Sequence, residues 1–586
     1  MTPAQTLQSA AKLLAAGDLH GATHLVSALL ATRPGDANAL RLMGVIALHA
    51  GNPASALDYL HRALDADPIA ARSHGTLASA LCSVGRLDDA ASHATRSVEL
   101  DPAYADGHVV LGLVRTQRGE LTAAVESLRR AISLRPADSS AHNLLGNALS
   151  SAGRNDEAIA AYRESIRVNP GNSVAHDNLL LALNHHRGDD AATTFAEHVA
   201  WAQLHAPSPP GAFECQVDRD PHRRLRIAYL SPDFRRHAVS CFFAPLLAAH
   251  DRQRVHVTLY ANVQVEDEVS ARLKSLADGW VHVAALSDQQ LLDRIRTDRI
   301  DIAIDLAGHT AGNRLRALAG RAAPIQVSYL GYPNTTGVRA IDLLITDVDL
   351  DPPRLRTDRW HVEQLIRLPR TMHAYRPPDE APELAPRPAG AIRFGSFNRL
   401  EKLTPRTFDL FAAALRAAPQ AMLTIKTPAL SDADTSRRVI DQLADRGVPP
   451  ARVTLLGRDP TPAEHLARYH DIDIALDSYP YNGTTTTCEA LWMGVPVITL
   501  EGPTRVARTT GGILRAIDLS ELCAADEADF ARIAAALAED SVRLRQLRTD
   551  LRRRMTESPL MRPGALAGEV ESALRSAWCG WCAGSD

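Results

Sequence analysis

Four consecutive threonines stand at the start of a predicted helix, directly after a turn. They lie in the segment Asp477–Glu489 (DSYPYNGTTTTCE), which follows the apolar run of a buried strand. The first N–H groups of a helix have no intrahelical acceptor and lie at the positive end of the helix dipole. Together with the hydroxyls of residues 484–487 they would form a site for a diphosphate, whereas helix capping would use only one or two of the four. Glu489, about one turn further along, can accept hydrogen bonds from ribose hydroxyls.

The first part of the chain repeats every 34 residues. Three residue types keep this step: prolines at Pro34, Pro68, Pro102, Pro136 and Pro170, glycines at Gly17, Gly51, Gly85, Gly119 and Gly153, and alanines at Ala22, Ala56, Ala90, Ala124 and Ala158. This is the period of the tetratricopeptide repeat, in which the glycine ends one helix, the alanine fills a helix crossing and the proline stops the second helix. We predict an α superhelix of tetratricopeptide repeats over residues 1–184, which binds a protein or peptide partner and performs no chemistry.

After the repeats, prolines cluster in a predicted linker at 185–222, and short β-branched runs then alternate with helical stretches. The first group of runs is Arg226–Ser231, Val255–Tyr260, Ile300–Leu306, Ile325–Leu330 and Ile341–Thr346. The second group is Ile392–Phe397, Met422–Lys426, Arg452–Leu456, Ile472–Leu476 and Val495–Leu500. We predict two doubly wound, Rossmann-like α/β domains at 223–388 and 389–556, followed by a C-terminal helix and tail at 557–586. A ligand would bind in a cleft at the carboxyl ends of the strands.

Composition limits the partners of the protein. The formal net charge of the 586 residues is -4, so we expect no nucleic acid partner, and no apolar run is long enough to predict a membrane span. Seven cysteines without framework spacing are typical of a reducing, cytoplasmic location. Cys579 and Cys582 form the one CxxC; without a second pair nearby we favour a solvated tail over a metal or redox site.

Four motifs in order resemble the protein O-linked N-acetylglucosamine transferases and their SPINDLY relatives, glycosyltransferase family 41. They are Ser231–His237 (SPDFRRH), Leu330–Gly337 (LGYPNTTG), Phe394–Lys402 (FGSFNRLEK) and Asn482–Glu489 (NGTTTTCE). The resemblance covers residues 226–559. It implies a GT-B fold and transfer of N-acetylglucosamine from UDP-GlcNAc to Ser or Thr hydroxyls of a protein on the repeats. It also implies inversion at the anomeric carbon, without a metal or other cofactor.

The resemblance also assigns residues. Lys402 would bind the donor diphosphate, where an ammonium stabilises the charge that builds up as the diphosphate leaves. His465 would pack on the base. His237 would lie on the acceptor side as a candidate general base, and His309, just after the predicted strand 300–306, is a second catalytic candidate whose role stays open. The donor-binding set is Gly331, Tyr332, Pro333, Asn398, Arg399, Lys402, His465, Thr484, Thr485, Thr486, Thr487 and Glu489.

Some features leave alternatives open. Arg399 stands where the animal enzymes have Gln, and the segment Gly331–Gly337 with the four threonines is closer to SPINDLY, whose plant members transfer fucose from GDP-fucose. A GDP-fucose-dependent protein transferase is therefore one alternative, and an inactive nucleotide-binding adaptor is another. The DxD pairs at 347–349 and 471–473 resemble a metal motif, but the first is typical of a turn and the second of strand alternation, so we expect no catalytic metal.

Overall fold

The computed structural model describes residues 1–207, 217–385 and 390–584. The described chain forms two compact units, residues 1–170 together with 431–435, and residues 171–430 together with 436–586. The predicted boundary between residues 388 and 389, and Pro209 and Pro210 of the predicted linker, lie outside the described residues. None of the described helices is long and apolar enough to cross a membrane.

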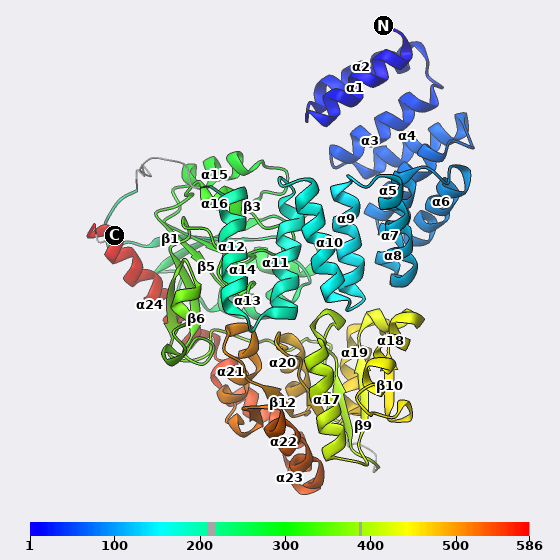
Figure 1. The fold of residues 1–586 in the computed structure, drawn as a ribbon. Helices are drawn as coiled ribbons and strands as arrows, with labels where there is room; N and C mark the ends of the chain where they lie inside the picture. The colour runs from blue at the N-terminus through cyan, green and yellow to red at the C-terminus, as the bar shows by residue number, and fades with distance from the viewer. Residues whose placement is uncertain (208–216, 386–389, 585–586) are drawn as a thin grey trace. The chain divides into compact units, whose positions relative to one another are not determined.

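The first unit is an array of paired helices (Figure 1). Its helices are α1 Pro3–Ala15, α2 Leu19–Thr32, α3 Ala37–His49, α4 Pro53–Ala66, α5 Ala71–Ser83, α6 Leu87–Leu100, α7 Ala105–Arg118, α8 Leu121–Leu134, α9 Ser139–Ser151 and α10 Asn155–Val168. The register glycines end the first helix of each pair with a positive φ, such as 71° at Gly51 and 80° at Gly119, which glycine adopts at little cost. The register alanines, such as Ala56 and Ala124, have no exposed surface. The repeat pattern therefore predicted both the turns and the helix crossings.

Two further helices belong to the second unit. They are α11 Ser173–Arg187 and α12 Ala191–His205. The prediction of a linker from residue 185 was wrong for this part, because α12 is a helix with a buried Trp201 that packs with Leu230 and Tyr260 of the first sheet. A helix that covers a sheet need not keep the 34-residue register, which is why the repeat pattern did not reveal it.

The first α/β domain contains a seven-stranded parallel sheet. Its strands are β1 Leu225–Ser231, β2 Val255–Ala261, β3 Gly279–His282, β4 Ile302–Asp305, β5 Ile325–Ser328, β6 Leu343–Asp347 and β7 Gln364–Leu368, in the order β3-β2-β1-β4-β5-β6-β7. Its helices are α13 Ala238–Ala249, α14 Glu268–Leu276, α15 Asp288–Thr297 and α16 Leu315–Ala319. Both faces are buried: Ile227 and Tyr229 of β1 join one core cluster, and Ala228 and Leu230 join the other. All five predicted strands are present, and β3 and β7 are additional.

The second α/β domain has a six-stranded parallel sheet in the order β10-β9-β8-β11-β12-β13. The strands are β8 Arg393–Ser396, β9 Met422–Lys426, β10 Val453–Leu456, β11 Ile474–Leu476, β12 Val497–Leu500 and β13 Cys523–Ala524. The helices are α17 Pro405–Ala417, α18 Ala433–Ala444, α19 Pro462–Ala467, α20 Thr485–Trp492, α21 Thr509–Ala516, α22 Glu527–Glu539 and α23 Ser541–Glu557. Two doubly wound domains of this kind, after helical repeats, are the predicted GT-B architecture.

The last helix, α24 Pro563–Cys582, returns to the first domain. Val570, Leu574 and Trp578 are buried in the core cluster that contains β1 and β2. The predicted helix is present, but Cys579 and Cys582 lie within its last turn and are half-buried, so the prediction that they form a solvated tail was wrong. The amphipathic pattern of a helix does not say which distant sheet it covers.

Candidate active site

Asp477 fixes the loop that leads into α20. This residue directly follows β11 and is 3% exposed. One carboxylate oxygen accepts a hydrogen bond from the N–H of Gly483 at 2.8 Å, and the other accepts one from the Thr499 hydroxyl at 2.8 Å. Burial raises the pKa of Asp477, although these hydrogen bonds oppose the shift. The loop is thereby closed, and the chain enters α20 with the helix N-terminus at the carboxyl edge of the sheet.

The four threonines have different surroundings. Thr484 is the N-cap residue of α20, yet no side chain caps this helix. The Thr486 hydroxyl donates to Oδ1 of Asn398 at 2.9 Å, and the buried Thr487 hydroxyl lies 2.9 Å from that of Thr510. Capping therefore does not explain the run, and the first N–H groups of α20 keep their capacity to bind an anion.

Lys402 lies beside the same loop. It ends a short 3-10 helix that follows β8, and its Nζ donates to the main-chain oxygen of Asn482 at 3.1 Å. The ammonium also lies 4.2 Å from the centre of the Tyr481 ring. Burial lowers the pKa of Lys402 to about 8, although Asp477 opposes the shift. The neighbouring Arg399 side chain is 74% exposed and forms an ion pair with Glu401 at 2.6 Å.

A second cluster lies about one turn further along α20, at Glu489. Nε2 of His465, on α19, is 3.3 Å from a carboxylate oxygen of Glu489. Its Nδ1 is 2.8 Å from Nζ of Lys426, the last residue of β9. An ammonium can only donate, so Nδ1 accepts from it and Nε2 carries the proton that is donated to Glu489. Lys426 also pairs with Asp459 at 2.9 Å. Sequence reasoning missed Lys426, although its position at the carboxyl end of a parallel strand was a signal for it.

The predicted donor contacts of the first domain lie on the loop 330–337, which follows β5. A Cβ at Gly331 would lie 1.8 Å from the main-chain oxygen of Leu306, so only glycine fits there. Tyr332 is 2% exposed, and its hydroxyl accepts from Nδ2 of Asn184 at 2.8 Å and lies 2.7 Å from Nε2 of His198. The side chain of Tyr332 is thus held by α11 and α12, which leaves Gly331, Pro333 and the main chain of this loop for the predicted donor contacts.

The two candidate catalytic histidines, His309 and His237, differ in their exposure to solvent. His309 is 1% exposed; its Nδ1 is 2.8 Å from Asp177 of α11, and its Nε2 is 2.8 Å from the main-chain oxygen of Thr336. With both ring nitrogens engaged, His309 joins α11 to the loop 330–337 and has no nitrogen left to receive a substrate proton.

His237, the N-cap residue of α13, is more accessible. Its side chain is 39% exposed, and its Nδ1 accepts from the N–H of Val239 at 3.3 Å and lies 3.5 Å from Asp233. Burial lowers the pKa of His237; the negative charge of Asp233 opposes this shift, and the positive charges of Arg235 and Arg399 add to it. Arg399 belongs to the second domain, and Phe242 of α13 packs in the core cluster of that domain. His237 therefore lies at the start of the helix of the first domain that packs against the second domain.

Asp347 and Asp473 of the two acidic DxD pairs accept hydrogen bonds from main-chain groups. Asp347 accepts from the N–H groups of Asp349, Leu350 and Met372 at 2.8–3.0 Å, which is the predicted turn. Asp473 accepts from the N–H of Arg393 at 2.7 Å, at the amino ends of the neighbouring strands β11 and β8. Among residues 1–207, 217–385 and 390–584, no group of three or more His, Cys, Asp or Glu is placed to hold a metal ion.

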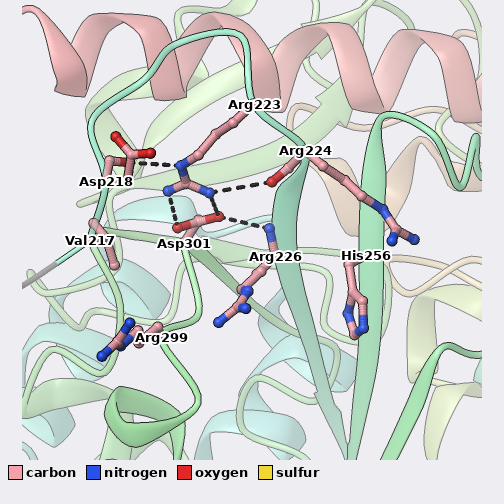
Figure 2. A pocket seen from close by; sticks show the side chains of 8 residues that line it. All are labelled: Val217, Asp218, Arg223, Arg224, Arg226, His256, Arg299 and Asp301. Carbon is pink, nitrogen blue, oxygen red and sulfur yellow. Dashed lines mark hydrogen bonds and ion pairs between the residues drawn. The ribbon is translucent and has the colours of Figure 1, made fainter.

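A hollow of about 440 Å³ lies at the amino ends of β1, β2 and β4 in the first sheet (Figure 2). Arg226 and His256 are the second residues of β1 and β2, and Asp301 directly precedes β4. Figure 2 shows the Arg223 guanidinium held by Asp301, at 2.6 Å, and by the main-chain oxygen of Asp218. None of the four motifs reaches this hollow, which lies at the amino ends of the strands, away from the predicted donor site.

Helical repeats followed by two doubly wound, parallel α/β domains define a GT-B type of fold. Comparison with known proteins gives the family. The family model "Glycosyl transferase family 41" matches residues 163–375 and 384–567, and the model "Tetratricopeptide repeat" matches 9–71, 76–142 and 117–173. These matches span most of the chain. The protein belongs to glycosyltransferase family 41.

Individual relatives agree with this assignment. The chain is 36% identical to "Probable UDP-N-acetylglucosamine--peptide N-acetylglucosaminyltransferase SPINDLY" of Solanum lycopersicum, over 69% of this chain and 44% of that protein. It is 30% identical to the protein of the same enzymatic name, SEC, of Arabidopsis thaliana, over 62% of this chain and 38% of that protein. The chain thus spans less than half the length of these relatives. A solved O-GlcNAc transferase mutant of Thermobaculum terrenum is similar with a TM-score of 0.83 and 36% identity, over 89% of this chain and 99% of that one.

Proposed function

We propose that this protein transfers N-acetylglucosamine from UDP-GlcNAc to serine or threonine hydroxyls of a protein. The observation that carries the proposal is the side-by-side arrangement of the Lys402 ammonium and the uncapped N-terminus of α20 at one loop. Both features stabilise a leaving diphosphate. The choice of UDP-GlcNAc as donor and of a peptide as acceptor is supported by the names of the relatives.

In the proposed reaction the acceptor oxygen attacks the anomeric carbon as the bond from that carbon to the diphosphate oxygen breaks. One displacement without a covalent intermediate inverts the configuration at that carbon. Negative charge grows on the diphosphate, and Lys402 and the α20 N–H groups stabilise it more in the transition state than in the ground state. These groups supply the positive charge at the leaving group, so the proposed reaction uses no metal or further cofactor.

The accessible His237 is the candidate for the group that takes the acceptor proton. Its exposed ring and lowered pKa leave it neutral at pH 7, as a base must be. His309 is instead proposed to hold the loop 330–337 in place. In this proposal Glu489 binds the ribose, and His465 packs on the base with its ring orientation set by Lys426. The tetratricopeptide array would bind the acceptor protein, and a cytoplasmic location fits the scattered cysteines.

Transfer of fucose from GDP-fucose is the second candidate. It is favoured by the similarity to SPINDLY and by the loop 331–337. Guanine would need a hydrogen-bond acceptor for its amino group, and Asp459 is a carboxylate that could serve. Asp459 instead forms ion pairs with Lys426 and Arg468, which disfavours this candidate. An inactive adaptor is disfavoured because Lys402 and Glu489 keep the geometry of a donor site.

The test is release of UDP or GDP from each nucleotide sugar, with proton NMR of the product to read its anomeric configuration. We expect UDP release from UDP-GlcNAc to exceed GDP release from GDP-fucose at least tenfold, with inverted product. Faster reaction with GDP-fucose would replace the donor, retained configuration would overturn the single displacement, and no release from either sugar would support the adaptor.

A further inference from the structure

The C-terminal end of α11 contacts the donor loops of both domains. Asn184 has no exposed surface; its Nδ2 donates to the Tyr332 hydroxyl at 2.8 Å, and its Oδ1 accepts from Nδ2 of Asn334 at 2.9 Å. The next residue, His185, turns to the second domain, where its ring lies 4.8 Å from the ring of Tyr481 in an edge-to-face arrangement. Adjacent residues of one helix therefore support the two halves of the site.

Tyr481 connects His185 to the proposed phosphate-binding lysine. The Lys402 ammonium lies 4.2 Å from the centre of the Tyr481 ring, whose electron-rich face attracts a cation. The next residue, Asn482, accepts the hydrogen bond from Nζ. A shift of the Tyr481 ring would therefore move both groups that hold the ammonium.

The side chain of His185 packs against Tyr481 and is not placed to act as an acid or a base. His185 is 8% exposed, and its Nδ1 has no hydrogen-bond partner in the described part of the chain. Burial, followed by the positive charges of Lys402 and Arg399, keeps the pKa of His185 well below its usual range. The ring is neutral at pH 7 and excludes water from Tyr481 without adding a second cation.

We propose that His185 is a positioning residue, which holds Tyr481 against the Lys402 ammonium and keeps water away from it. The role of Lys402 at the diphosphate rests on the proposed function, whereas the packing of His185, Tyr481 and Lys402 does not. The proposal makes α11 a structural part of the donor site, in addition to its place after the last repeat.

The consequence is measurable in the protonation of Lys402. Burial lowers its pKa to about 8, Arg399 adds to this shift, and Asp477 and Glu401 oppose it. Removal of the His185 ring would admit water to the ammonium and favour its charged form, so the pKa would rise. Asn184 is also buried on the same helix but contacts the other domain, which makes Asn184→Ala the matched control.

The experiment compares wild type, His185→Ala, His185→Phe and Asn184→Ala by acetylation with acetic anhydride between pH 6.5 and 10. Mass spectrometry reads the labelling of Lys402 against the exposed Lys12, which is simple because the sequence has four lysines. We expect a midpoint near pH 8 in wild type, in His185→Phe and in Asn184→Ala. The midpoint of His185→Ala should rise by about one unit or more. The alkaline limb of kcat/KM for donor turnover should move in the same direction.

A midpoint in His185→Ala equal to that of wild type would overturn the proposal, as would an equal rise in Asn184→Ala. If His185→Ala does not fold, His185→Asn removes the ring, places a polar side chain that binds water beside Tyr481, and gives the same comparison. Should wild type turn over no nucleotide sugar, the proposed function fails, but the acetylation midpoints still decide the role of His185.

Discussion

Replacement of Lys402 by methionine removes the ammonium beside the α20 N-terminus while keeping an unbranched side chain of similar length. An exposed ion pair is worth about 0.2–1 kcal/mol, which would cost less than about tenfold in rate. Lys402 is not exposed in this way, because it is partly buried under Tyr481 and its pKa is lowered to about 8. A preorganised group of this kind contributes about 2.7–4 kcal/mol to a transition state, so the rate should fall by about 10²–10³-fold.

The assay is kcat/KM for UDP release, with UDP affinity measured by calorimetry on the same protein. Lys274→Met is the matched control, since Lys274 is exposed on α14 outside the site. Lys402→Met should unfold at no lower a temperature than wild type at pH 7, because burial disfavours the charge it removes. In wild type, kcat/KM should fall as pH rises through about 8, where Lys402 loses its proton.

The reasoning would be refuted if Lys402→Met, in a form that still binds the donor, kept activity within about threefold of wild type. A loss of similar size in Lys274→Met would show that the effect is not specific to the site. Folding is checked by the unfolding temperature of both variants.

Three further predictions address the rest of the site. Glu489→Ala should weaken UDP binding in calorimetry by roughly 10- to 100-fold, the value of a hydrogen bond to a charged group; unchanged affinity would place the ribose elsewhere. His309→Ala should lower the free energy of unfolding in urea by about 1–3 kcal/mol, because the buried partners of His309 are left unpaired. A slower donor turnover at unchanged stability would instead indicate that His309 is a catalytic residue. A chain starting at Gly171 should bind UDP as the full chain does, while one starting at Arg223 should lose binding together with α11 and α12; equal binding by both would show that these helices are dispensable.

The strands of the two sheets could be predicted where apolar β-branched runs end abruptly. β9 has the predicted bounds, and four of its five residues are buried. β3 escaped prediction because it is four residues long and none of them is buried, so no apolar run marks it. β13 has only two residues.

The part of the proposed donor site that lies on one continuous segment could be predicted from the sequence. The threonine run and Glu489 are neighbours in sequence, and α20 begins within the run, as predicted. Contacts between distant segments were not predictable from the pattern. The engagement of His309 by Asp177, the Lys426–His465 contact and the packing of His185 on Tyr481 depend on how α11 and the two sheets come together. A single sequence carries no signal for such tertiary pairs.

The most direct test of the nucleotide site is a calorimetric titration of the full chain with UDP and with GDP under the same conditions. UDP should bind at least tenfold more tightly, a difference of about 1.4 kcal/mol, and Lys402→Met should weaken the binding of UDP. Tighter binding of GDP would contradict UDP-GlcNAc as the donor. The absence of binding by either nucleotide would contradict the assignment of the α20 N-terminus and Lys402 as a nucleoside diphosphate site.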